Sequence, residues 1–85
     1  MPFEIIWAAT ARKDLKRLDS QIAKRIYEKV ESLGKLDCVF LEKVVGKEFY
    51  KFRVGSYRIF IEKFPATGKL SIIHVRHRRN AYKNS

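Results

Sequence analysis

The chain has 85 residues, enough for one domain with a single modest core. Nineteen Lys and Arg residues stand against nine Asp and Glu residues, which gives a formal net charge of +10. A hydrophobic share of 46% excludes a disordered chain, and the charge favours a polyanionic partner such as RNA, DNA, the ribosome or an acidic protein.

The first half of the chain predicts a short strand and two helices. Residues 3–7, FEIIW, are β-branched and aromatic residues typical of a strand. Apolar residues then recur at helical spacing in two runs, which Asp19-Ser20 separates and Gly34 ends. We expect a short amphipathic helix and a longer one, with a capping side chain between them.

The second half predicts an antiparallel meander. Residues 35–47 have the weak pattern of a loop, in which 41–45 are the candidates for a short strand. Three stretches with strand character follow at 49–54, 57–64 and 70–76, joined by turns at 55–56 and 65–68. This order predicts one α+β domain over residues 1–85, with both helices packed on one face of a three-stranded meander.

Cysteine and histidine usage exclude several kinds of site. The single cysteine, Cys38, rules out an internal disulfide, and no Cys/His set has metal-ligand spacing. No signal-peptide pattern opens the chain, and no apolar run approaches the length of a membrane span. We therefore expect a cytoplasmic protein with no metal, no cofactor and no membrane partner.

The two-residue turn at Gly55-Ser56 fixes the register of the first hairpin and places like charges together. Arg53 is expected directly opposite Arg58, with Lys51 two residues along and Glu62 as the only acid on that face. Such a pair is destabilising by about 1 kcal/mol in water, so the face suits an external anion unless the side chains simply splay into solvent. The core face is expected to hold Tyr50, Phe52, Val54, Tyr57, Ile59 and Ile61, and the opposite face Phe49, Lys51, Arg53, Arg58, Phe60 and Glu62.

The last strand leads into the cationic stretch HVRHRRNAY, residues 74–82. If Ile73 and Val75 complete the core face, then Ile72, His74 and Arg76 lie on the open face beside Arg58. Basic residues interleaved with aromatic ones can neutralise phosphates and stack bases, so this face is interpreted as an RNA site.

Cleavage of RNA by its own 2′-OH needs a base, cations at the phosphate and an acid. His74 and His77 lie three apart and would face opposite sides of a strand, so they are poor partners. Tyr82 is the other candidate, although a tyrosine's usual pKa of about 10 is high for a base unless cations favour the phenolate. From the residues alone, an RNA-binding face with or without nuclease activity remains open.

Two segments carry a resemblance to a known family. YKFRVGSYRIFIE and VRHRRNAY, together with the opening strand and KDLKRL, resemble a RelE-type toxin of the RelE/ParE toxin–antitoxin superfamily over nearly the whole length. The resemblance implies a microbial-ribonuclease-like fold and a metal-independent mRNA interferase that cuts messenger RNA in the ribosomal A site.

The resemblance also implies roles for individual residues. Arg58 would stabilise the phosphorane, one of Arg76 and Arg78 would assist the leaving group, and Tyr82 would act as base or stack on a substrate base. The RNA-binding residues would be Lys51, Arg53, His77 and Arg79.

Partners and alternatives follow from the same resemblance. A cognate antitoxin with an acidic wrapping segment is expected beside the ribosome and mRNA. A ParE-like inhibitor of DNA gyrase and a non-catalytic RNA- or ribosome-binding module are the competing functions.

Overall fold

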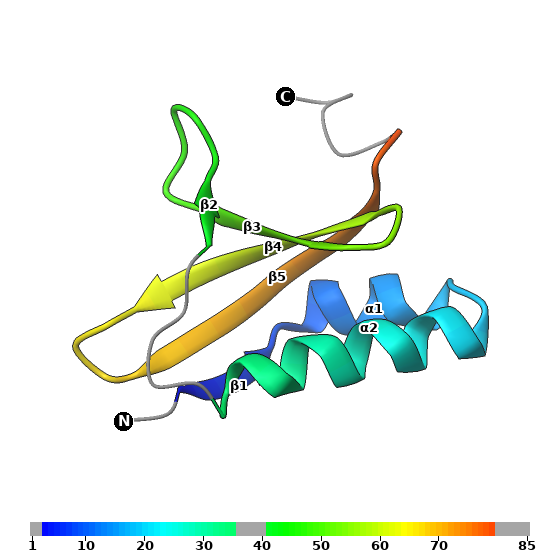
Figure 1. Cartoon of the computed structure of the whole chain (residues 1–85), viewed down its shortest axis with the longest axis horizontal. Helices are drawn as coiled ribbons and strands as arrows, with labels where there is room; N and C mark the ends of the chain where they lie inside the picture. Colours follow the sequence, from blue (N-terminus) through cyan, green and yellow to red (C-terminus); the bar gives the residue numbers. More distant parts are fainter. Residues whose placement is uncertain (1–2, 36–40, 80–85) are drawn as a thin grey trace.

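The computed structural model describes residues 3–35 and 41–79 (Figure 1). Two helices and a five-stranded sheet form the expected α+β arrangement, with the helices in one layer and the meander in the other (Figure 1). Among the described residues, no helix is long and apolar enough to span a bilayer. The elements are β1 Glu4–Trp7, α1 Ala9–Lys16, α2 Ser20–Leu33, β2 Glu42–Lys43, β3 Tyr50–Val54, β4 Tyr57–Phe64 and β5 Lys69–His77.

Local signals determine where the longer helix begins and ends. The side chain of Asp19 accepts a hydrogen bond from the backbone N–H of Gln21 at 2.9 Å, so the expected capping group is confirmed. Gly34 occupies the C-terminal cap, as its place after the last periodic residue predicts. The break between the helices therefore comes from a residue that stabilises a helix start.

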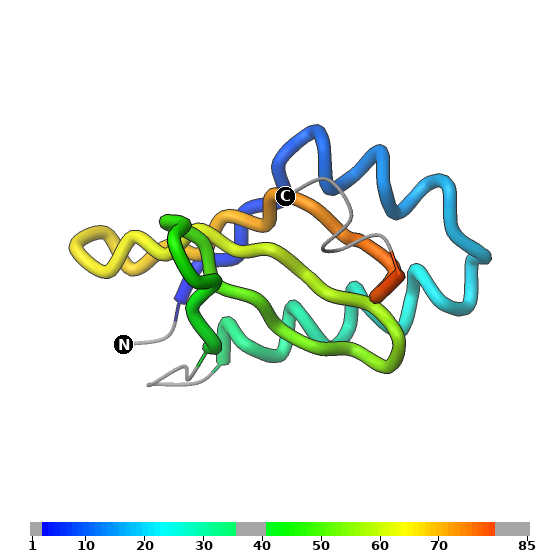
Figure 2. Tube along the Cα trace, turned by 90° about the horizontal axis from the view of Figure 1, so that it is seen from above, coloured from blue at the N-terminus to red at the C-terminus, as the bar shows by residue number. Residues whose placement is uncertain are grey.

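The sheet contains two strands more than the meander alone. Its order is β1-β5-β4-β3-β2, with β1 parallel to β5 and the other neighbours antiparallel (Figure 2). The two-residue strand β2 lies within the stretch 41–45 that the sequence indicated. The three-stranded meander is thus confirmed, and it is extended on both sides.

The register of the β3–β4 hairpin is confirmed at every predicted pair. Tyr50 faces Ile61, and the ladder continues through Arg53 opposite Arg58 to Val54 opposite Tyr57. Gly55 has a φ of 57°, the left-handed conformation that a glycine-first hairpin turn requires. The turn therefore places both arginines on the face that the sequence predicted.

The assignment of the β5 side chains to the two faces of the sheet is wrong at Ile72. Ile72, which was expected on the open face, is fully buried and pairs with Ile61, whereas Ile73 is left between two pairs. The next pair is Phe60 with His74, so β5 carries one extra residue, a β-bulge. Because Ile73 is the extra residue, the residues after it lie on the faces that the sequence predicted, and His74 is on the open face as expected.

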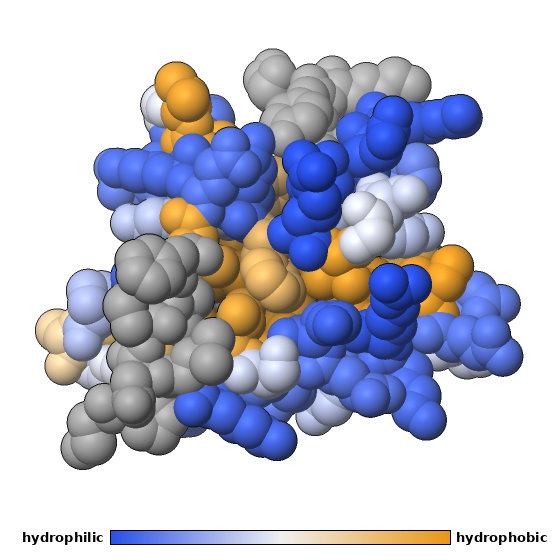
Figure 3. All heavy atoms as spheres, viewed as in Figure 1, coloured by the Kyte–Doolittle hydropathy of each residue, from blue (hydrophilic) through white to orange (hydrophobic). Residues whose placement is uncertain are grey.

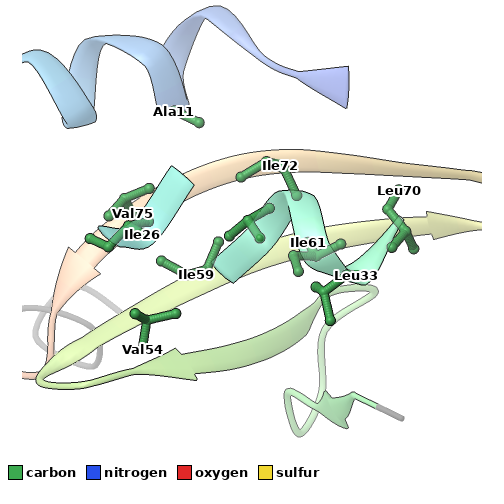
Figure 4. Close-up of a cluster of buried hydrophobic side chains, with 10 residues drawn as sticks. Ala11, Ile26, Leu33, Val54, Ile59, Ile61, Leu70, Ile72 and Val75 are labelled. Carbon is green, nitrogen blue, oxygen red and sulfur yellow. The ribbon is translucent and has the colours of Figure 1, made fainter. Parts of the chain in front are cut away.

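The core lies between the helices and the inner face of the sheet (Figure 4). α2 contributes three buried side chains, and α1 contributes one. The buried residues are Ala11, Ile26, Val30, Leu33, Val54, Ile59, Ile61, Leu70, Ile72 and Val75. Of the predicted core face, Phe52 and Tyr57 are half-buried against this cluster.

Gly34 is a point of close approach between α2 and the N-terminal strand. A Cβ at this position would lie 2.8 Å from the carbonyl oxygen of Phe3 and 3.1 Å from Cγ1 of Ile5. We expect Gly34→Ala to lower the free energy of unfolding by about 1–3 kcal/mol, because the backbone has to shift. Thermal unfolding measures this effect, and Lys35→Ala at the exposed next position is the control. An unchanged melting temperature in Gly34→Ala would contradict the packing described here.

Candidate nucleic-acid interface

Three arginines form a row across the open face of the sheet, the face that carries no helix. Arg53 on β3 lies directly opposite Arg58 on β4, and Arg58 lies directly opposite Arg76 on β5. Adjacent strands in a sheet are separated by about 4.8 Å, so neighbouring members of the row stand close together. These three residues are called the arginine row below.

A second row runs parallel to the first, two residues along each strand. Lys51 pairs with Phe60, and Phe60 pairs with His74. Glu42 of β2 pairs with Lys51 at the end of this row. A half-buried phenylalanine between two basic side chains gives a nucleobase a ring to stack on beside groups that can bind its phosphate.

Two basic residues of this face have carboxylate partners that the sequence did not reveal. Lys51 Nζ lies 3.7 Å from Glu42 Oε1, and Arg76 Nη1 lies 2.8 Å from Asp14 Oδ2. Glu62 was predicted as the only acid on the open face of the hairpin, and neither of these partners belongs to the hairpin. Both acids come from elements outside the hairpin, so the hairpin register alone did not place them.

The other two members of the arginine row, Arg53 and Arg58, lack a carboxylate partner within residues 3–35 and 41–79. Among the described residues, the Arg58 guanidinium makes only a long contact, 3.4 Å from Nη1 to the backbone oxygen of Tyr57. Two facing guanidinium groups repel each other by about 1 kcal/mol in water and by more where solvent is excluded. An anion between them would remove this repulsion.

Asp14 of α1 closes the outer edge of β5 where β1 ends. The β1–β5 pairing stops at Ile72, whose carbonyl accepts the N–H of Ala8 at 2.9 Å. Beyond it, the Thr10 hydroxyl donates to the carbonyl of Ile73 at 2.6 Å, and Asp14 Oδ2 accepts the N–H of Val75 at 2.9 Å. Side chains of a helix thus satisfy the backbone groups that a strand would otherwise pair.

The same oxygen of Asp14 binds two side chains of the open face. It lies 2.8 Å from Arg76 Nη1 and 3.3 Å from Nδ1 of His74. Sequence reasoning missed this residue, although a signal exists. Asp14 lies three residues after Ala11 and directly before Leu15, so helical spacing places an acid at the inner side of an otherwise basic helix.

The two histidines lie on opposite faces of β5, as their spacing predicted. His74 is on the open face, and 37% of its side chain is exposed. His77 pairs with Tyr57, their rings meeting edge to face with centroids 5.3 Å apart. Its Nδ1 accepts the N–H of Arg79 at 3.2 Å, so His77 is used in local structure away from the arginine row.

The remaining predicted residues lie at or beyond the end of β5. Arg78 and Arg79 are exposed, and the N–H of Arg78 donates to the carbonyl of Ser56 at 2.7 Å. This bond joins the end of β5 to the turn of the hairpin that carries Arg53 and Arg58. Tyr82 lies outside the described residues.

An apolar strip separates the hairpin from α2 on another side of the molecule (Figure 3). A groove of about 240 Å³ opens there between Ile22 and Ile26 of α2 and Tyr57 of the hairpin. It lies on the helix side of the sheet, so it is separate from the arginine row. In the described part of the chain, His, Cys, Asp and Glu side chains form no cluster of three or more that would suit a metal.

Known proteins share both the sequence pattern and the fold. The family model for the ParE toxin of the type II toxin–antitoxin system parDE matches residues 5–82. A chain of the RelB–RelE antitoxin–toxin complex from Methanococcus jannaschii is 30% identical, with a TM-score of 0.73 over 94% of this chain and 98% of that one. A chain of the RelBE2 toxin–antitoxin complex from Mycobacterium tuberculosis is 23% identical, with a TM-score of 0.76 over 92% of this chain and 100% of that one. A mutant of Escherichia coli RelE in the free state is 18% identical, with a TM-score of 0.75 over 95% and 88%.

The fold is that of small toxins whose solved structures include complexes with antitoxins. Among curated protein sequences, none matches this chain significantly. The chain belongs to the ParE toxin family of type II toxin–antitoxin systems, and it is a RelE-type member of the RelE/ParE superfamily.

Proposed function

We propose that this toxin is a ribosome-dependent endoribonuclease that cuts mRNA in the ribosomal A site and so inhibits translation. The observation that carries the proposal is the arginine row, in which Arg53 and Arg58 have no carboxylate partner in the described part of the chain. Guanidinium groups bind phosphate oxygens through paired N–H donors, so the row suits a phosphodiester.

The proposed reaction is attack of the 2′-oxygen on the adjacent phosphorus, without a metal. Arg58, at the middle of the row, would stabilise the charge of the crowded phosphate, and Arg53 would bind the backbone on one side. Arg76 or Arg78 would assist the departing 5′-oxygen. Lys51 and the exposed Arg79 would hold neighbouring phosphates, while Phe60 and Tyr82 would stack on bases.

The proposed partners are the ribosome with its mRNA and a cognate antitoxin. Solved structures similar to this one are complexes of RelE with RelB. An antitoxin for this chain would cover the arginine row with acidic residues, because the uncompensated charge there favours carboxylates as it favours phosphates. Both partners would then compete for one surface in the cytoplasm.

A second function keeps support from the family model, which describes ParE toxins. A ParE-like inhibitor of DNA gyrase would act through protein contacts, and the apolar groove beside Tyr57 offers a surface for them. The arginine row favours the nuclease, because a protein-contact inhibitor does not need guanidinium groups placed opposite one another.

Primer extension on a programmed ribosome tests the nuclease against this alternative. Ribosomes carrying a defined mRNA with an empty A site are mixed with the toxin, and the cut is mapped to the nucleotide. We expect a cut within the A-site codon, and DNA supercoiling by gyrase unaffected at the same toxin concentration. Intact mRNA together with inhibited gyrase would reject the nuclease and favour the second function.

A further inference from the structure

His74 has the placement of a proton-transfer group. It lies on the open face, directly across from Phe60 and two residues before Arg76, so it borders the arginine row. Its side chain is 37% exposed, which leaves the ring accessible to a ligand on that face. Histidine is the side chain whose ordinary titration range includes neutral pH, which makes it the commonest general base in enzymes.

One ring nitrogen of this histidine contacts the carboxylate of Asp14. The carboxylate is only 11% exposed and is held by the backbone N–H of Val75 at 2.9 Å. Nδ1 of His74 lies 3.3 Å from the same oxygen. When Nδ1–H donates to the carboxylate, Nε2 keeps its lone pair and is available to accept a proton.

We propose that His74 is the general base of the toxin and that Asp14 is its positioning residue. This inference rests on the proposed nuclease function. Nε2 of His74 takes the proton of the 2′-OH while the 2′-oxygen forms a bond to the adjacent phosphorus and the bond from phosphorus to the 5′-oxygen breaks. The products are a 2′,3′-cyclic phosphate and a 5′-hydroxyl whose proton comes from water or from another group of the site, and His74 returns its proton to solvent.

Charged groups from three elements lie around His74. Asp14 of α1 faces its ring, and Arg76 of the same strand and Arg58 of β4 lie beside it in the arginine row. Lys51 lies beyond Phe60 in the same row and pairs with Glu42. A carboxylate on one side and arginines on the other keep the base next to the phosphate they bind.

His77 does not have this placement. Its ring packs edge to face on Tyr57, and its Nδ1 already accepts a backbone N–H from Arg79 at 3.2 Å. The chain has two histidines, so replacing each in turn shows which of them gives the pH dependence of cleavage. This gives the experiment a matched pair of substitutions.

The test measures single-turnover cleavage on programmed ribosomes between acid and alkaline pH. The parent, His74→Gln, His77→Gln and Asp14→Asn are compared at each pH, so the ratio to the parent removes the titration of the ribosome itself. We expect His74→Gln to slow cleavage about 100-fold or more and to abolish the rise of the rate with pH. His77→Gln should keep that rise, whatever its effect on affinity.

Asp14→Asn distinguishes positioning from a purely structural role. Asparagine keeps an oxygen for the N–H of Val75 but loses the charge that faces His74 and Arg76. We expect cleavage to fall about 10–100-fold while the melting temperature and the rise with pH are retained. Equal cleavage in Asp14→Asn and the parent would overturn the positioning role.

The outcomes separate the two proposals. Parent-like cleavage and pH dependence in a folded His74→Gln variant would overturn the base assignment while leaving the nuclease in place, and so would loss of the pH dependence in His77→Gln alone. Absence of cleavage by the parent would instead overturn the proposed function. Circular dichroism confirms folding, and His74→Asn serves as a second amide if His74→Gln is unstable.

Discussion

Arg58→Ala is expected to slow mRNA cleavage about 100- to 1,000-fold and to leave the fold intact. Arg58 occupies the middle of the arginine row, with Arg53 on one side and Arg76 on the other. Removal of one preorganised donor to a developing negative charge typically costs about 100- to 1,000-fold in rate. Since the side chain lies on the open face and forms no ion pair with a described carboxylate, its loss removes repulsion and no core contact. Cleavage on programmed ribosomes and growth arrest on expression measure the effect.

The matched control for this substitution is Arg25→Ala. Arg25 is an exposed residue of α2, on the other side of the sheet, and its replacement changes the net charge by the same amount. We expect this variant to cut mRNA as the parent does. Equal cleavage by Arg58→Ala and the parent, with equal expression, would show that the arginine row is not the catalytic surface. A loss shared by both variants would indicate an effect of net charge alone.

Ile61→Ala is expected to remove a large part of the stability of the domain. Ile61 is fully buried, and it pairs with Ile72 immediately beside the bulge in β5 (Figure 4). Truncation of a buried isoleucine to alanine costs about 2–5 kcal/mol, whereas a domain of this size has about 4–13 kcal/mol in total. The melting temperature should fall by roughly 10–30 °C, as thermal unfolding followed by circular dichroism would measure.

Ile22→Ala makes the same chemical change at an exposed site. Ile22 on α2 is 39% exposed, so the loss of stability should stay below about 1 kcal/mol. If Ile61→Ala melted within a few degrees of Ile22→Ala, the core would not be organised around the middle of β4. The comparison therefore tests burial, with side-chain chemistry held constant.

Local rules explain why the central hairpin could be predicted from the sequence. A two-residue turn that starts with glycine leaves one register, and that register assigns every side chain of β3 and β4 to a face. The turn alone therefore predicts that Arg53 and Arg58 lie opposite each other, whatever the rest of the fold. The capping role of Asp19 is similarly local, because the bond reaches only two residues along the chain.

Contacts between distant segments could not be predicted in this way. β1 pairs with β5 across more than 60 residues of sequence, and no local signal selects that neighbour. The ion pair between Asp14 and Arg76 is also a contact between distant segments, since α1 follows β1 in the chain and packs beside β5. The sequence thus predicted which cations share the open face of the sheet, but it did not predict the carboxylates that hold two of them.

The bulge at Ile73 has a consequence for how this protein tolerates changes in length. Side chains alternate between the two faces of a strand, and Ile73 is one residue in excess of that alternation. Its neighbours Ile72 and His74 therefore face opposite sides, as consecutive residues of a regular strand do. A variant lacking Ile73 would lose the bulge and keep Leu70, Ile72 and Val75 in the core, with His74 and Arg76 still on the open face. Deletion of Ile73 should therefore leave toxicity intact, whereas deletion of Val75 should abolish it, because either His74 or Arg76 then turns toward the core. A deep scan of insertions and deletions would show that dependence as an abrupt boundary within one strand.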